Sequence, residues 1–108
     1  MVLKYNMEID AAAICTNIKR LIGQVYKLLP NREENVDWQT PLTTIIEELS
    51  GMSRLLIGQQ ENLFSLLCKL EGLYTLDKEE DFFSYRRTIF ECLNLLSIIK
   101  GEIEICQD

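Results

Sequence analysis

Apolar residues recur every three or four positions along most of this chain, which is the spacing of one face of an α-helix. The longest series keeps strict heptads from Leu42 to Tyr74, and a second series keeps them from Phe82 to Cys106. A period of 3.5 residues is typical of helices that pack nearly parallel or antiparallel. The pattern therefore predicts an all-α protein built as an antiparallel bundle.

The same pattern divides the chain into three long helices within a single domain over residues 1–108. These helices are predicted over about 8–29, 41–74 and 77–106. Pro30 is expected to end the first one, because proline lacks an N–H and clashes with the preceding turn. The polar segment 31–40 then connects the first two helices across the end of the bundle.

Two of the predicted helix starts carry residues suited to capping. Thr40 and Pro41 place a hydroxyl at the N-cap and a proline at the first helical position, where its missing N–H costs nothing. Asp77 is expected to cap the third helix, with Glu80 three residues later as its capping-box partner. These acids have a structural explanation, so we do not assign a metal site to them.

The middle of the chain leaves one alternative open. Gly58 and Gln59 lie inside the longest heptad series, and a break near Gly58 would give four helices. We favour one continuous helix, since a loop would normally reset the heptad phase and the phase is unchanged across Gly58. In that helix Gln59 is a polar residue in the core series, which either fixes the register or lies at a kink open to water.

The third helix is apolar on more than one side. Besides its heptad series it carries Phe83, Phe90, Ile98 and Ile105, a second stripe that a three-helix monomer would struggle to cover. Either this helix lies centrally in a four-helix arrangement, or the stripe is a subunit interface. We favour the interface and predict that the protein self-associates as a homodimer.

Charge is negative overall and unevenly distributed. The net charge of −6 makes a general nucleic-acid or anionic-membrane binder an unfavoured class, because phosphate binding needs a basic surface. Residues 1–32 carry five bases and two acids, whereas residues 33–81 carry three bases and eleven acids. The simple interpretation is a basic helix beside an acidic one. The alternative is an acidic face for a basic partner, including a mimic of nucleic acid.

The chemistry that most enzymes need is sparse in this sequence. Histidine, the commonest general base and metal ligand, does not occur. The magnesium-dependent all-α nucleotide pyrophosphohydrolases use E-E-x-x-E followed by E-x-x-D; here Glu47 and Glu48 supply the first pair, but Gly51 stands where the third acid should be. We therefore expect no enzyme, no cofactor and no metal, and keep this hydrolase class only as a second alternative.

The cysteines and the apolar runs bear on location. None of the four cysteines forms a C-x-x-C pair, so we expect them to be reduced and mostly buried, as in a cytoplasmic protein. Cys68 falls outside the main stripe and is the best candidate for an exposed thiol. No uncharged run approaches the ~18 residues that a membrane span needs.

A cluster of aromatic residues and arginines on the third helix is the best candidate for recognition. We predict a small interaction or regulatory protein that docks on a protein partner, such as an adaptor, an inhibitor, or an immunity or antitoxin-like factor of a phage or mobile element. Nucleic-acid binding through Arg86 and Arg87 is the alternative, while the simplest role for these arginines is to pair with nearby acids. Trp38 either plugs the bundle end or anchors a partner. The candidate surface comprises Phe83, Arg86, Arg87, Phe90, Ile98 and Ile105.

Overall fold

The computed structural model describes the backbone of residues 2–54, 56 and 58–107, and the side chains of 12–54, 56 and 58–103. In this part of the chain all regular structure is helical, so the all-α prediction is confirmed. The four α-helices are α1 (Val2–Glu33), α2 (Gln39–Gly51), α3 (Gln60–Gly72) and α4 (Phe82–Gln107), with 3₁₀ turns at Leu73–Thr75 and Glu79–Asp81.

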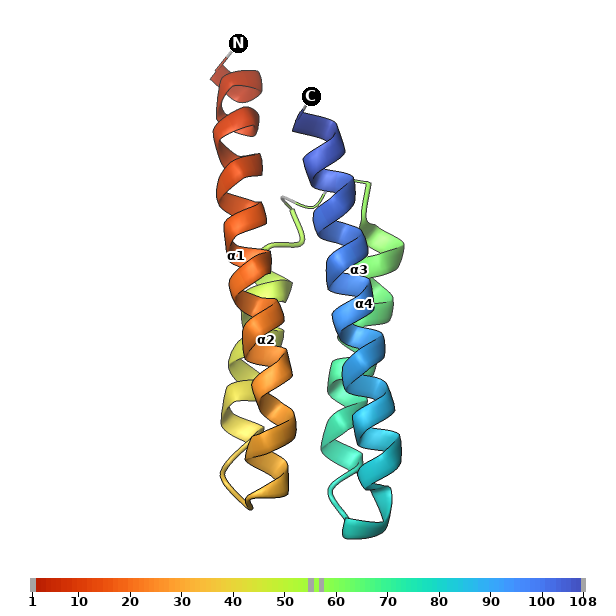
Figure 1. Ribbon diagram of the computed structural model, residues 1–108. Helices are drawn as coiled ribbons and strands as arrows, with labels where there is room; N and C mark the ends of the chain where they lie inside the picture. Colours follow the sequence, from red (N-terminus) through yellow and green to blue (C-terminus); the bar gives the residue numbers. More distant parts are fainter. Residues whose placement is uncertain (1, 55, 57, 108) are drawn as a thin grey trace.

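The helices lie side by side and alternate in direction (Figure 1). Each contacts the next along the chain, and α4 also packs on α1, so the four enclose a common core. The short helices α2 and α3 cover one half of α1 and α4, whose other halves continue together toward the two termini. The molecule measures 53 × 21 × 18 Å. None of the helices described here combines the length and apolar character needed to cross a membrane.

The prediction of one continuous helix over 41–74 is wrong. The chain leaves helical geometry after Gly51 and re-enters it at Gln60, with the direction reversed between α2 and α3. Gly58 lies in this reversal with a φ of +85°, a backbone conformation that L-residues with a Cβ adopt at a cost. The alternative of four helices is therefore the correct one.

The reversal does not disturb the heptad phase, and this explains the error. Met52 and Leu56 lie in the connecting segment, yet both side chains are buried in the core. The Leu56 N–H donates to the Met52 carbonyl at 3.2 Å, and the Gln59 N–H donates to the Leu56 carbonyl at 3.1 Å. These turns bring an apolar residue back to the core at the spacing of the flanking helices. Phase alone could not distinguish the turns from helix.

Helix α1 also extends further than predicted, because Pro30 does not end it. The helix continues to Glu33 and closes at Asn35, whose φ is +58°. The Val36 N–H donates to the Asn31 carbonyl at 2.8 Å and the Asn35 N–H to the Arg32 carbonyl at 3.2 Å, the two hydrogen bonds of a Schellman motif. The left-handed asparagine, rather than the proline, stops the helix.

Helix α2 begins two residues earlier than predicted, and its cap is not Thr40. The Asp37 carboxylate accepts hydrogen bonds from the N–H groups of Gln39 at 3.1 Å and Thr40 at 3.2 Å. Hydrogen bonding from the side chain and backbone of Thr40 lowers the pKa of Asp37. Pro41 still lies in the first turn, where N–H groups have no partner within the helix.

The predicted capping box at the start of the last helix is absent from the described structure. Lys78 stands before the 3₁₀ turn at Glu79–Asp81 without a side-chain capping bond, and α4 begins only at Phe82. Asp77 makes no hydrogen bond within the described residues and lines a pocket instead.

All four helices contribute to one apolar core, as the heptad pattern requires. Tyr85 is the largest fully buried side chain, and Trp38 packs edge-on against it with ring centroids 5.1 Å apart. The other residues with no exposed surface are Ile18, Leu21, Val25, Leu28, Leu42, Leu49, Leu66, Leu70, Leu73, Ile89, Cys92, Leu96 and Ile99.

We expect Gly58→Ala to destabilise the fold by about 1–2 kcal/mol, because alanine is strained at positive φ. Gly23→Ala is the matched control: a Cβ added at either glycine would meet no atom within 4 Å, but Gly23 is helical. This control should gain up to about 1 kcal/mol. Urea unfolding followed by circular dichroism measures both changes. Equal effects of the two substitutions would contradict the strained turn.

Cys68 is exposed on α3, as the sequence predicts, whereas Cys92 is buried in the core. Burial raises the pKa of Cys92 to about 12. We therefore expect iodoacetamide at about pH 8 to label Cys68 rapidly and Cys92 only on unfolding, as read by mass spectrometry. Because the unfolded thiol ionises near pH 9 and the folded one does not, Cys92 should also lower the free energy of unfolding as pH rises above about 9. Rapid labelling of native Cys92 would contradict this placement.

Candidate interaction site

Arg32 joins two connections that are far apart in the sequence. Its side chain leaves the last turn of α1 and reaches the segment between α3 and α4, where Nη2 donates hydrogen bonds to the carbonyls of Leu76 at 2.7 Å and Lys78 at 2.6 Å. The guanidinium carbon lies 4.5 Å from the ring centre of Tyr85 and 5.4 Å from that of Phe82. One side chain thus ties the end of α1 to the start of α4.

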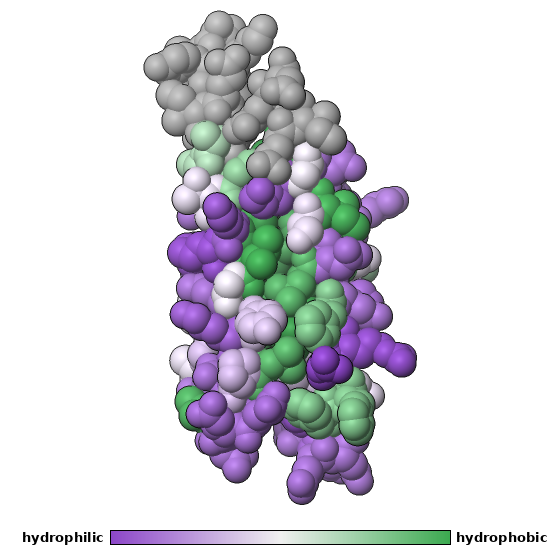
Figure 2. Space-filling model, in the orientation of Figure 1, coloured by the Kyte–Doolittle hydropathy of each residue, from purple (hydrophilic) through white to green (hydrophobic). Residues whose placement is uncertain are grey.

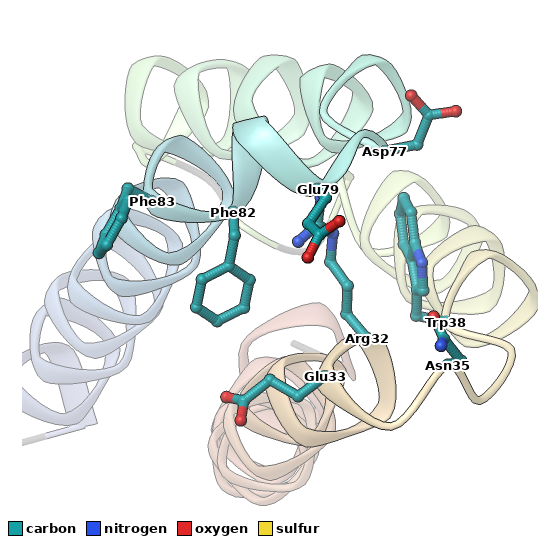
Figure 3. Close-up of a pocket in the computed structure, with 8 residues that line it drawn as sticks. All are labelled: Arg32, Glu33, Asn35, Trp38, Asp77, Glu79, Phe82 and Phe83. Carbon is teal, nitrogen blue, oxygen red and sulfur yellow. The ribbon is translucent and has the colours of Figure 1, made fainter.

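A pocket of about 660 Å³ opens beside this junction (Figure 3). Figure 3 shows Arg32 crossing from the end of α1 toward Glu79, with Trp38 on one side and Phe82 on the other. The pocket is lined by Arg32, Glu33, Asn35, Trp38, Asp77, Glu79, Phe82 and Phe83. Its walls therefore combine aromatic rings with carboxylates. The lining residues come from the end of α1 and the segment after it, and from the start of α4 and the segment before it.

The end of the molecule around the pocket is strongly acidic. Seven carboxylates lie in the two short segments 33–37 and 77–81, which the fold places at the same end. The two ion pairs among the described residues, Arg20–Glu48 and Lys69–Glu91, include none of the seven. Arg32 itself donates to carbonyl groups rather than to carboxylates. The negative charge at this end is therefore not compensated by ion pairs within the described chain.

The outer face of α4 exposes large apolar side chains, as the surplus stripe suggested. Phe83 is 81% exposed, Phe90 44% and Ile98 41%. Arg86 lies over the Phe90 ring at 5.2 Å, and neither Arg86 nor Arg87 makes an ion pair in the described structure. The side chain of Ile105, the last residue of the predicted stripe, lies outside the described residues.

Figure 2 shows how these features appear on the side where α1 and α4 lie together. Apolar atoms follow the seam between the two helices and spread over part of the α4 side, with polar atoms along both edges.

The expectation that Arg86 and Arg87 pair with neighbouring acids is not met among the residues that the structure describes, since neither arginine takes part in an ion pair there.

The remaining candidate residues lie apart from this surface. Trp38 is only 7% exposed and packs on Tyr85, so its ring belongs mainly to the core. Gln59 directly precedes α3 and is half-buried, and its side-chain oxygen accepts a hydrogen bond from the Asn62 amide at 3.1 Å. Gly58 lies beside it in the chain reversal.

The acids of the described structure do not come close enough together to ligate one metal ion. No group of three or more histidine, cysteine, aspartate or glutamate residues is arranged to hold a metal ion among those residues. Glu48, from the incomplete hydrolase pattern, pairs with Arg20 of α1. A set of dispersed carboxylates suits an extended cationic partner better than a single ion.

Sequence reasoning missed the pocket and the role of Arg32, and the number of helices is the reason. In an alternating arrangement of three helices, the first and second connections lie at opposite ends. With four helices, the first and third connections lie at the same end. The signal that could have revealed the pocket was the charge pattern itself, since segments 33–37 and 77–81 hold seven of the seventeen acids in the sequence.

Comparison of this chain with protein-family models, with curated proteins and with solved structures finds no match. Function is therefore inferred from the geometry and charge of the chain itself.

We expect Arg32→Ala to lower the free energy of unfolding by about 1.5–3 kcal/mol, because two hydrogen bonds from a charged donor are lost. Arg32→Lys should recover only part of this, since an ammonium cannot reproduce the planar contact with Tyr85. Arg54→Ala is the control, because Arg54 is exposed and makes no ion pair in the described structure, and it should change stability by less than about 0.5 kcal/mol. Equal stability of the two alanine variants in urea unfolding would contradict the junction.

Proposed function

We propose that this protein acts by docking on another protein, as a small helical interaction or regulatory factor. The observation that carries the proposal is the acidic end of the molecule, where seven carboxylates have no ion-pair partner in the described structure. Three of them, Glu33, Asp77 and Glu79, line an open pocket with aromatic walls. The partner that fits this end is a protein with an exposed segment rich in lysine or arginine. We interpret the four helices as one antiparallel bundle that holds the two acidic connections together.

The charge of the site supports a basic partner for a simple electrostatic reason. An exposed pair of opposite charges contributes little alone, about 0–1 kcal/mol. Several carboxylates around one pocket, however, create a local potential that attracts a cationic segment and speeds its association. Binding of this kind weakens as salt screens the charges.

The aromatic walls supply what charge alone does not. Phe82 and Phe83 offer apolar surface at the pocket, and the aliphatic stems of lysine and arginine pack well on such rings. Arg32 already lies over the Phe82 ring, so the site holds one arginine of its own in the geometry proposed for a partner's cation. The pocket would seat one basic side chain while the rim holds its neighbours.

The same observations bear on the two alternative functions that the sequence leaves open, a nucleic-acid-related protein and a nucleotide pyrophosphohydrolase. An acidic mimic of nucleic acid would also offer carboxylates to a basic protein, so it is the form of the nucleic-acid alternative that the acidic end favours. Arg86 and Arg87 are exposed but lie beside an acidic rather than a basic surface. The pyrophosphohydrolase alternative has no converging carboxylates to support it in the described residues.

Homodimer formation is a separate part of the proposal, and it concerns the outer face of α4, which adjoins the pocket at Phe83. The exposed apolar residues on α4 support it, because an apolar surface exposed on a protein often marks a site of interaction with another protein. We infer that the homodimer forms through α4, which leaves the carboxylates of segment 33–37 open to a second protein.

Fluorescence of Trp38, the single tryptophan and a lining residue of the pocket, reports on the proposed docking directly. We expect a short lysine- and arginine-rich peptide to shift its emission at ~50 mM salt, with affinity falling steeply by ~200 mM. The double variant Glu33→Lys/Glu79→Lys should weaken binding at least tenfold.

The matched control is Glu47→Lys/Glu71→Lys, which changes the net charge equally at two exposed acids outside the pocket. This control should bind within about threefold of the unmodified protein, because distant surface charges are screened. Equal weakening in both double variants would show that only overall charge matters, and would contradict a site at the pocket.

A further inference from the structure

The outer face of α4 has a symmetric pattern that its exposure alone does not reveal. Phe90 and Ile98 each lie four residues from Asn94, one helical turn on either side. Arg87 lies seven residues before Asn94 and Glu102 eight residues after it, about two turns on either side. All five residues are exposed in the structure. In a two-fold antiparallel helix pair, each residue faces the one at the same distance on the other side of the axis, so here an apolar residue meets an apolar one and a base meets an acid.

Charge favours the antiparallel pairing over the parallel one. Arg86 and Arg87 lie in the first half of α4, and neither makes an ion pair within the described chain. Glu102 lies in the second half and is likewise without an ion pair there. An antiparallel partner brings Glu102 opposite Arg87 at both ends of the contact, whereas a parallel partner opposes like charges. The helix dipoles are also opposed in the antiparallel pair.

The other charged residues of this stretch do not offset the pattern. Glu91 is committed to Lys69 of α3, at 3.2 Å. Lys100 is half-buried rather than exposed on the outer face. Ser97 and Gly101 are small, and a Cβ built at Gly101 would meet no atom within 4 Å, so a second helix has room to approach.

We propose that the partner of this face is a second copy of the same chain, packed with α4 antiparallel to its counterpart and the two-fold axis at Asn94. Phe90 of each protomer then packs on Ile98 of the other, and Arg87 of each pairs with Glu102 of the other. The two Asn94 amides meet on the axis, where a polar pair fixes the register of paired helices. This inference rests on the homodimer part of the proposed function and not on the basic partner.

Light scattering after size-exclusion chromatography tests whether the outer face of α4 forms the homodimer. The unmodified protein should be a dimer, and Phe90→Ser/Ile98→Ser should be a monomer with unchanged helix content. Phe64→Ser is the control, because Phe64 is 70% exposed but lies on α3; it should remain a dimer. A monomeric unmodified protein, or a dimer that survives the double substitution, would overturn the proposal.

Charge exchange tests the register. Arg87→Glu and Glu102→Arg should each weaken self-association at least tenfold, because each homodimer then opposes like charges at two places. An equimolar mixture of the two variants should form a heterodimer of near-normal affinity, because both opposing pairs are restored. Rescue of Arg87→Glu by Glu80→Arg, and not by Glu102→Arg, would place the axis near Phe83 and overturn the register proposed here.

Binding of the basic peptide, read from Trp38 fluorescence, separates this proposal from the docking function. The monomeric variant Phe90→Ser/Ile98→Ser should bind the peptide as the unmodified protein does, because neither residue lines the pocket. Loss of peptide binding together with the dimer would show that one surface serves both purposes, and would overturn the assignment of α4 to a second copy alone.

Discussion

The reversal of the chain between α2 and α3 is the constraint on which the rest of the structure depends. It turns what the heptads suggest is one helix into two short antiparallel helices, and so makes the number of helices even. An even number places the connection after α1 and the connection before α4 at the same end. The pocket, the acidic rim and the Arg32 junction all exist because of that placement.

The end of the molecule is then held by contacts that are specific rather than merely apolar. Asn35 closes α1 in a left-handed conformation, Asp37 caps α2, and Arg32 binds the carbonyls of the connection before α4. Below them Trp38 and Tyr85 pack edge to face in the core. Arg32 donates to carbonyl groups and not to carboxylates, and the acids on the rim make no ion pair in the described structure. This uncompensated charge is the physical basis of the proposed docking.

The sequence predicts which residues are buried far better than it predicts the path of the chain. Leu42, Leu49, Leu63 and Leu70 all reach the core as the heptads require. The reversal was not predicted because buried residues in the turns keep the heptad period. The predicted end of the first helix at Pro30 was wrong because Asn35, five residues later, closes the helix. Arg32 could not be identified in advance, since its partners are main-chain carbonyls 44 and 46 residues away. The exposed residues on α4 were found from sequence because surplus apolar surface shows in the pattern itself.

The most direct test of the chain reversal is the proximity of Trp38 to Tyr85. The structure places the two ring centres 5.1 Å apart. One continuous helix over 41–74 would instead separate the starts of the second and last helices by about 50 Å, at ~1.5 Å per residue. Nuclear Overhauser spectroscopy of the assigned protein should show strong cross-peaks between the protons of the Trp38 indole and those of the Tyr85 ring. Their absence, with the indole protons giving cross-peaks only to residues at the other end of α4, would contradict the chain reversal and the acidic pocket that depends on it.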